Sequence, residues 1–457
     1  MKAEELRRQG RVSAALAAAR GPVGALSAEM LVVRAHTLWD MENPAAAAEL
    51  AFEAARRAPE LPAARAMRGL AQLDAGDLGA AWDEAEYAQR RAPDEPLTYL
   101  LLSELQGEHG QFEEAVALLS EAVRRRPFDA DLRLARAAQL SSLDRDEEAL
   151  RETEIVLTRF PEHNTALSQQ AVLLAMAGRT DPALDSSALA VRLDPRCAVS
   201  LMGQGFVHAL REEDQKARRV LDRAVRASPK SSRVAWARAV PEVRSDPHTA
   251  LGLLHDGLLL CRPSTCADIR YLRAVCHYHL EAWDDSRRLL DAVVAAQPWR
   301  VDALDLRSLL LLIADEETAA LRDAQAVLRR NPDEPRARSV RGAVHLRHER
   351  WAAAVEDSSV ALEKEPQDML SLWVHGMASA MAGSTAQAQG DLKRLAALDP
   401  DGELTNQLSG LLTASRPQAA QTDWNKRVWE VLGRVGTVVG IAGALMGAGG
   451  SDGGGSA

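Results

Sequence analysis

The residues best suited to chemistry are three cysteines and two histidines within one short segment, CRPSTCADIRYLRAVCHYH. They are Cys261, Cys266, Cys276, His277 and His279. Zinc sites favour closely paired ligands, with two to four residues between the cysteines. Here four and then nine residues intervene, and Cys276 falls inside a predicted helix. The pattern therefore favours buried small side chains over a metal site.

Other kinds of chemistry find equally little support in the sequence. A Cys–His nucleophile pair needs a third group that orients the base, and the spacing suggests none. The glycines do not form a phosphate-binding loop. A formal net charge of −10 argues against nucleic acid, because phosphate binding requires a basic surface. We therefore expect a non-enzymatic protein with no cofactor, no metal and no nucleic-acid ligand.

The elements that would position any site follow a strict repeat. Prolines recur every 34 residues from Pro59 to Pro400, with one step of 35 residues between Pro263 and Pro298. The segment GQFEEAVALLSEAVRRRP, residues 110–127, shows the common layout: a glycine, an aromatic residue, alanines at fixed positions, and a final proline. Each period predicts a helical hairpin that ends before its proline, and stacked hairpins would share one core. In the seventh period Pro241 interrupts the first helix, so we expect a kink there.

With this 34-residue helix–turn–helix period and its recurring Gly, Ala and Pro, the chain resembles the tetratricopeptide repeat family. The resemblance implies an all-α, right-handed superhelical solenoid of about eleven repeats that binds a protein or peptide on its concave face. We expect an N-terminal half-repeat or cap at residues 1–27, the solenoid at 28–401 and a capping helix at 402–415. After these we expect a linker at 416–423, an amphipathic-to-apolar helix at 424–448 and a flexible Gly/Ser tail at 449–457.

The resemblance also implies that one residue of each repeat points into the concave groove, at position 5 when the proline is position 32. These residues are Val32, Ala66, Leu100, Leu134, Ser168, Met202, Trp236, Tyr271, Asp305, Ser339 and Trp373. Tyr278 and His279 extend the strip. We expect the partner to contact Met202, Trp236, Tyr271, Tyr278, His279, Asp305 and Trp373, since aromatic side chains dominate protein interfaces.

Packing between helices is the alternative role for these groove residues. Chaperone-binding members of the family place a Lys at position 5, where the early repeats here have Val32, Ala66 and Leu100. That activity is therefore not expected of this chain.

The C-terminal segment differs in composition from the repeats. Residues 428–447 reach the length of a membrane span only if Glu430 and Arg434 are included. Two G-x-x-x-G pairs would allow close helix association instead. The residues expected to mediate membrane contact or assembly are Trp424, Val428, Trp429, Leu432, Gly436, Gly440, Gly443 and Gly447. Packing on the solenoid, or disorder, is the third alternative.

We therefore predict a scaffold or adaptor that holds a protein or peptide in its groove, while the tail associates with a membrane or assembles a complex. The alternative is a membrane-active, pore-forming-like effector whose tail the solenoid shields until a partner or protease releases it. The charged N-terminal segment MKAEELRRQGRVSAALAAAR lacks an apolar secretory core. We expect the protein to be cytoplasmic, and any association with a membrane would be through the C-terminal tail.

Overall fold

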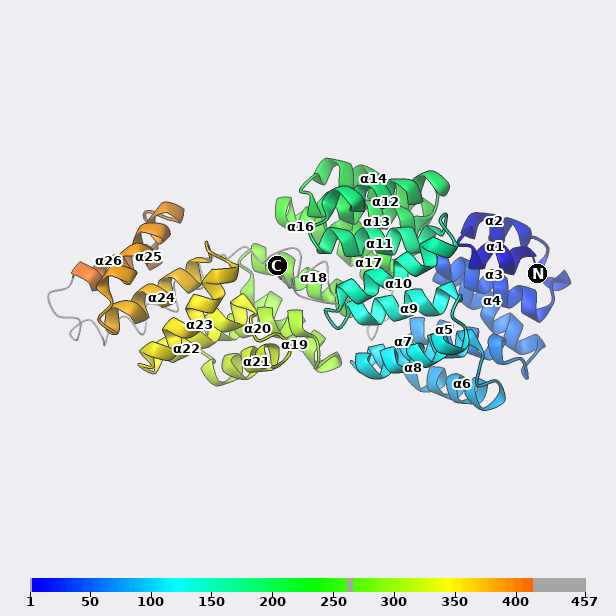
Figure 1. Cartoon of the computed structure of the whole chain (residues 1–457), viewed down its shortest axis with the longest axis horizontal. Helices are drawn as coiled ribbons and strands as arrows, with labels where there is room; N and C mark the ends of the chain where they lie inside the picture. The colour runs from blue at the N-terminus through cyan, green and yellow to red at the C-terminus, as the bar shows by residue number, and fades with distance from the viewer. Residues whose placement is uncertain (1, 261–265, 414–457) are drawn as a thin grey trace. The chain divides into compact units, whose positions relative to one another are not determined.

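The structure, a computed structural model, describes residues 2–260 and 266–413, and within these ranges every regular element is a helix (Figure 1). Contacts divide the chain into two compact units, one that ends at Arg273 and one that begins at Ala274. Residues 414–457, which include the predicted linker, amphipathic-to-apolar helix and Gly/Ser tail, lie outside the described residues, and so does Cys261.

The first unit begins with a short hairpin that precedes the repeats. It consists of α1 (Lys2–Arg8) and α2 (Val12–Ala18), and the 3₁₀ turn η1 (Val23–Ala25) leads from it to the first repeat. Six regular hairpins follow: α3 (Ala28–Asp40) with α4 (Pro44–Arg57), α5 (Pro62–Asp74) with α6 (Leu78–Arg91), α7 (Pro96–Glu108) with α8 (Phe112–Arg125), α9 (Ala130–Ser141) with α10 (Asp146–Arg159), α11 (Asn164–Met176) with α12 (Thr180–Leu193), and α13 (Ala198–Leu210) with α14 (Asp214–Ala227).

The seventh repeat is irregular where the sequence predicts a kink. Its first helix stops as α15 (Ser232–Ala239), and a short α16 (Glu242–Ser245) begins directly after Pro241. Its second helix is α17 (Pro247–Leu259). A proline at this place breaks the helix because it lacks the amide hydrogen and its ring clashes with the preceding turn. The predicted interruption is confirmed.

Four more hairpins follow, and α18, the first helix of the eighth repeat, contains the boundary between the two units. The helices are α18 (Ala267–His279) with α19 (Trp283–Ala296), α20 (Val301–Ile313) with α21 (Glu317–Arg330), α22 (Pro335–Arg347) with α23 (Trp351–Lys364), and α24 (Met369–Met381) with α25 (Thr385–Leu398). The last described helix, α26 (Glu403–Thr413), packs on α24 and α25. Besides the hairpin α1–α2, the described chain therefore contains eleven repeat hairpins in the order that the prolines predict.

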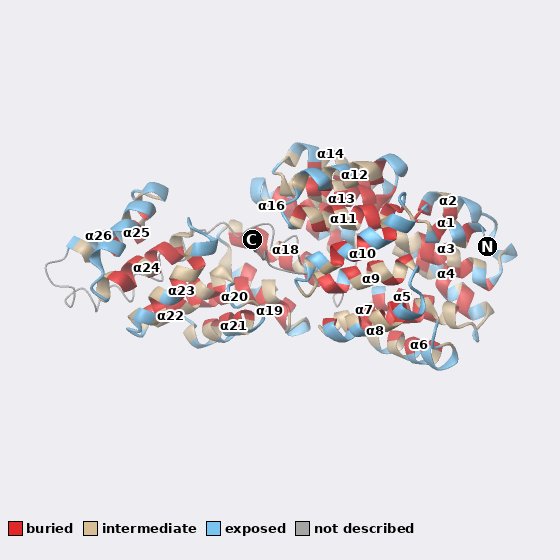
Figure 2. Cartoon of the chain, in the orientation of Figure 1, coloured by how far each residue is buried: buried red, intermediate tan, exposed pale blue. Residues whose placement is uncertain are grey.

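Small residues allow the two helices of a hairpin to approach closely. A Cβ atom on Gly69 of α5 would lie 3.1 Å from Glu84 Cβ of α6, and one on Gly205 of α13 would lie 2.5 Å from Leu221 Cγ of α14. The buried residues gather where helices meet, as Figure 2 shows, and alanines fill many of these places. Close helix approach is thus built into the repeat, as the sequence predicts.

A recurring ion pair joins the two helices within many hairpins, although it was not expected from the sequence. An arginine, or in one repeat a histidine, on the first helix pairs with a carboxylate sixteen residues later on the second helix. The pairs are Arg68–Glu84, Arg136–Glu152, Arg307–Asp323, Arg341–Asp357 and His375–Asp391. Each carboxylate is almost fully buried, so the pair fixes one helix of the repeat against the other.

The two helices of each repeat occupy different sides of their unit. First helices of successive repeats pack against one another, as α5 on α7 and α11 on α13 do in the first unit, and α20 on α22 does in the second. Second helices of successive repeats approach each other much less. Stacked hairpins converge on the inner side of a curved stack, so the first helices form the concave surface of each unit.

Candidate functional site

The N-terminal hairpin α1–α2 is held by residues of several distant repeats of the first unit. It packs on α3, the first helix of the first repeat, and its side chains reach the starts of α9 and α11 and the loop before α13. We call the residues that hold it the hairpin site, which consists of His36, Asp40, Asp131, His163 and Asp194. In Figure 1 the hairpin lies beside α3 and α4, near the N-terminus.

Arg7 is the central contact of the hairpin site. Its side chain is only 4% exposed, and its two terminal nitrogens donate to both oxygens of Asp131, at 3.1 and 2.7 Å. The same guanidinium lies 3.5 Å from Asp40 and 3.4 Å from Glu4. A guanidinium that binds a carboxylate through two parallel hydrogen bonds has a fixed orientation. Arg7 therefore fixes the position of α1 on repeats one and four together.

The turn between α1 and α2 rests on His163, which caps the start of α11. Gly10 has φ +71°, and a Cβ on it would lie 2.5 Å from the imidazole and 2.6 Å from the His163 Cα. His163 Nδ1 accepts the amide hydrogen of Ala166. On α2, the Ser13 hydroxyl donates to the Asp194 carboxylate before α13. The backbone of the turn thus contacts its site too closely for any side chain at residue 10.

The buried groups of the site have strongly shifted protonation. Burial, together with the Arg7 charge, lowers the pKa of His36 to about 4. Burial likewise lowers the pKa of His163 to about 4. Burial raises the pKa of Asp40, whereas at Asp131 the raising effect of burial is outweighed by the combined interactions with Arg7 and the neighbouring histidines, so its pKa is lowered. Both histidines are therefore neutral at pH 7, and the Arg7 charge is balanced by carboxylates alone.

The surface around the hairpin site carries further carboxylates. Asp129 caps α9, and burial raises its pKa to about 6. Burial also raises the pKa of Glu95, at the start of α7. These groups come from the repeats, whereas the arginines beside them, Arg7 and Arg8, come from α1. The repeats thus present an acidic surface to a basic helix.

A second contact closes the first unit near the same place. The turn between α3 and α4 meets the loop before α15, where the Ser231 hydroxyl donates to Glu42 at 3.1 Å. Arg233 pairs with the same carboxylate at 2.7 Å. Ser228 donates to the Met41 carbonyl. The first and seventh repeats are therefore in contact, which brings residues some 190 positions apart together.

The groove residues expected from the sequence are mostly buried. Tyr271 is 2% exposed, Trp373 is 1% exposed, and Met202, Tyr278 and Asp305 are also buried. Asp305 pairs with Arg336 of the next repeat. These five side chains pack within the repeats, so a partner could contact them only if the packing changed.

Trp236 and His279 are half-buried and so remain accessible in part. Trp236 lies 5.3 Å from Phe206, ring centre to ring centre. The contact of all seven groove residues with a partner stays a prediction. Nothing in the sequence singled out Arg7 or Asp131, because 124 positions separate them.

The second part of the segment that contains the cysteines and histidines lies within helix α18. Cys276 and Cys266 are buried, and His277 and His279 are half-buried on α18. Among the described residues, no three His, Cys, Asp or Glu side chains are grouped as metal ligands would be. No described helix is both long enough and apolar enough to cross a membrane.

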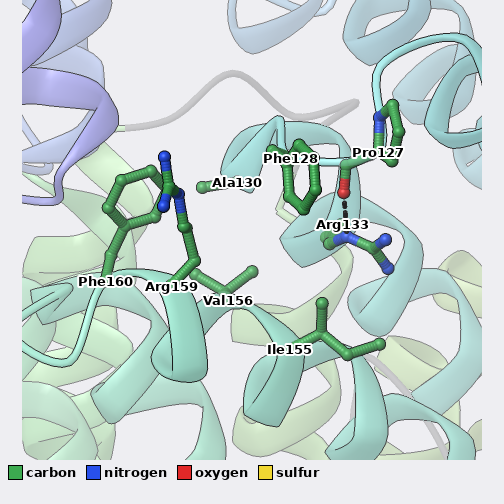
Figure 3. A pocket seen from close by; sticks show the side chains of 8 residues that line it. All are labelled: Pro127, Phe128, Ala130, Arg133, Ile155, Val156, Arg159 and Phe160. Atoms are coloured by element: carbon green, nitrogen blue, oxygen red, sulfur yellow. Dashed lines mark hydrogen bonds between the residues drawn. The ribbon is translucent and has the colours of Figure 1, made fainter.

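A small hollow lies between the loop before α9 and the end of α10 (Figure 3). Phe128 is 72% exposed, and the Arg159 guanidinium lies 5.9 Å from the ring centres of both Phe128 and Phe160. Arg133 closes one side by donating to the Pro127 carbonyl at 2.8 Å. The hollow holds no pair of groups suited to acid–base or nucleophilic chemistry.

Comparison with known proteins supports the repeat assignment. The tetratricopeptide repeat family model matches residues 32–96, 100–154 and 318–368. No curated protein sequence matches the chain significantly.

Several solved structures are similar to this chain. The APC/C hetero-tetramer Cut9–Hcn1 matches with a TM-score of 0.55 at 12% identity, over 90% of this chain and 95% of that one. Yeast Tom70 matches at a TM-score of 0.40 and 15% identity, over 88% and 99%. A tetratricopeptide repeat protein from Parabacteroides merdae matches at 0.37 and 18%, over 51% and 92%. Together with the eleven repeat hairpins and their proline period, the family match shows that this chain contains tetratricopeptide repeats.

Proposed function

We propose that the protein is a non-enzymatic scaffold that binds a helical segment of a partner protein on its concave surface. One observation carries this proposal: a helical segment outside the repeats already lies against the first helices of the first unit. The contacts that hold it, a buried guanidinium on two carboxylates and a backbone turn on His163, are those of a specific peptide complex. A surface that holds one helical segment in this way is suited to holding another.

The family supports the same function, because tetratricopeptide solenoids present extended concave surfaces to proteins. Two residues of the expected groove, Trp236 and His279, belong to this proposal because they lie on first helices and stay partly accessible. The C-terminal segment would localise or assemble the scaffold. That role rests on its sequence alone, since it lies outside the described residues.

The test is site-resolved crosslinking of the full-length chain in its native extract. Partners are identified by mass spectrometry, together with the residues to which they are linked. The proposal expects links to first helices. It also expects Trp236→Ala, on α15, to weaken capture, whereas Trp82→Ala, a half-buried tryptophan on the second helix α6, should not. Links confined to second helices, or equal loss with both variants, would show that the binding surface is elsewhere.

A further inference from the structure

The hairpin α1–α2 is not a regular part of the solenoid. Its helices have seven residues each, against twelve to fourteen in the regular hairpins of the first unit. Helices this short are not stable alone in water, so their order depends on the surface that they contact. The segment that joins them to α3 is exposed from Arg20 to Ala25. The hairpin is therefore a short ligand-like element on an accessible tether.

Few side chains attach the hairpin to the unit. Besides Gly10 in the turn, its buried residues are Ala3, Arg7, Val12, Ala15 and Ala19. Four of these are small apolar residues, which contribute little area, so recognition is concentrated at Arg7. The neighbouring Arg8 has the same charge, but its side chain is 53% exposed and pairs only with Glu4 of its own helix. The chain thus contains one anchoring arginine and one matched arginine that does not anchor.

Without the hairpin, the site that remains on the repeats is acidic. Asp40, Glu95, Asp129 and Asp131 face the position of Arg7 and Arg8, and Arg126 is a repeat cation whose charge acts on Glu95. His36 and His163 do not add positive charge at neutral pH, because burial lowers the pKa of each. His163 is 3% exposed, and its Nε2 atom has no hydrogen-bond partner among the described residues. The vacated site would therefore require a cationic ligand.

The geometry also selects the kind of cation. Asp131 receives two parallel hydrogen bonds while Asp40 lies on the same guanidinium. A planar guanidinium can satisfy both carboxylates, whereas a lysine ammonium is a point charge without a fixed fork. The contact of Gly10 with His163 adds a second requirement, a turn or small residue one helical turn after the arginine.

We propose that α1–α2 is a displaceable internal ligand, and that the partner binds the hairpin site with an alanine-rich helical segment whose single arginine replaces Arg7 on Asp131 and Asp40. The inference rests on the proposed function and names the partner's chemistry. The tethered hairpin would then compete with the partner, because an internal ligand has a high effective concentration. Partner binding would require the hairpin to leave.

The experiment uses the full-length chain with a protease recognition sequence inserted between Arg20 and Ala25. After cleavage, a fluorescent peptide of residues 1–19 is added and its exchange into the site is followed by anisotropy. We expect saturable binding to the cut chain and, at the same peptide concentration, at least about tenfold less binding to the uncut chain. Peptide R7A should bind about 100-fold or more weakly, and R7K about tenfold more weakly. Peptide R8A, the matched control, should stay within about threefold of wild type.

Several outcomes would overturn the inference. They are a cut chain that keeps its own hairpin and takes up no peptide, a cut chain that loses its helical circular dichroism, and R7A peptide that binds as well as wild type. Dimers formed by hairpin exchange would also overturn it, because the site would then serve a second copy. A measurement without cleavage provides a check: in the uncut chain, amides of residues 2–18 should exchange hydrogen faster than those of α3, and faster again in Arg7→Lys. If this inference about the hairpin fails, the proposed function is still tested separately by crosslinking, because crosslinking reports which helices a partner contacts.

Discussion

Replacing Gly10 by alanine should loosen the N-terminal hairpin, and the chain supplies a matched control at Gly178. Both glycines have left-handed backbone, with φ +71° and +72°. Alanine costs about 1–2 kcal/mol in that conformation, so both variants bear this part of the cost. Only the environment differs: no atom lies within 4 Å of a Cβ on Gly178, whereas a Cβ on Gly10 meets the ring and the Cα of His163.

The additional cost at Gly10 can be worked from this contact. The 2.6 Å approach is to backbone at the start of α11, so a side-chain rotation cannot relieve it. Overpacking of this kind costs about 1–3 kcal/mol beyond the backbone strain. The equilibrium constant for local opening of α1–α2 should therefore rise about 5- to 150-fold beyond the increase that backbone strain alone would cause.

Hydrogen exchange measured by mass spectrometry resolves this effect along the chain. In Gly10→Ala, amides of residues 2–18 should exchange faster, while those of α5 to α7 keep their wild-type rates. In Gly178→Ala, the hairpin amides should exchange as in wild type, and any change should be confined to the turn between α11 and α12. If Gly10→Ala leaves the hairpin amides unchanged, the hairpin does not rest on His163 and the reasoning is wrong.

Three further predictions concern other parts of the chain. Asp357 is a buried carboxylate that accepts hydrogen bonds from Arg338 and Arg341. Asp357→Asn should therefore lower the free energy of unfolding, measured in urea, by about 2–4 kcal/mol. Asp333→Asn, at an exposed carboxylate, should lower it by less than about 0.5 kcal/mol. Burial lowers the pKa of His163 to about 4 in the folded chain, so from pH 7 to pH 4 the unfolded state takes up a proton that the folded state excludes. Wild type should then lose up to about 3 kcal/mol relative to His163→Asn, which keeps a capping side chain. If residues 424–448 contact membranes, the full chain should float with liposomes and a chain ending at residue 413 should not; equal flotation would remove that role.

The repeat architecture could be predicted because its causes are local in sequence. A proline ends each second helix, small residues permit close contact within each hairpin, and Pro241 breaks one first helix. The ion pairs between the two helices of a hairpin also have a readable signal, a cation and a carboxylate sixteen residues apart. That signal is difficult to recognise in the sequence, because it occurs in only some repeats and the chain contains many other charged residues.

The groove could not be predicted to the same depth. Position 5 lies on the first helix of each repeat, but whether its side chain faces the partner or a neighbouring helix depends on how the hairpins stack. Tyr271 and Trp373 are large and apolar, and burial between helices removes more of their area from water than a concave surface would. Their types alone do not distinguish these two environments.

The sequence by itself determined the order of the repeat hairpins and the helix break at Pro241, because turns, prolines and small residues act over a few positions. Only the tertiary structure decided which distant residues meet. The curvature of the first unit brings Arg7 to Asp131 and Glu42 to Ser231. That curvature is the sum of small packing angles over several repeats, so no single segment of the sequence carries it. The hairpin site is a product of this accumulated geometry.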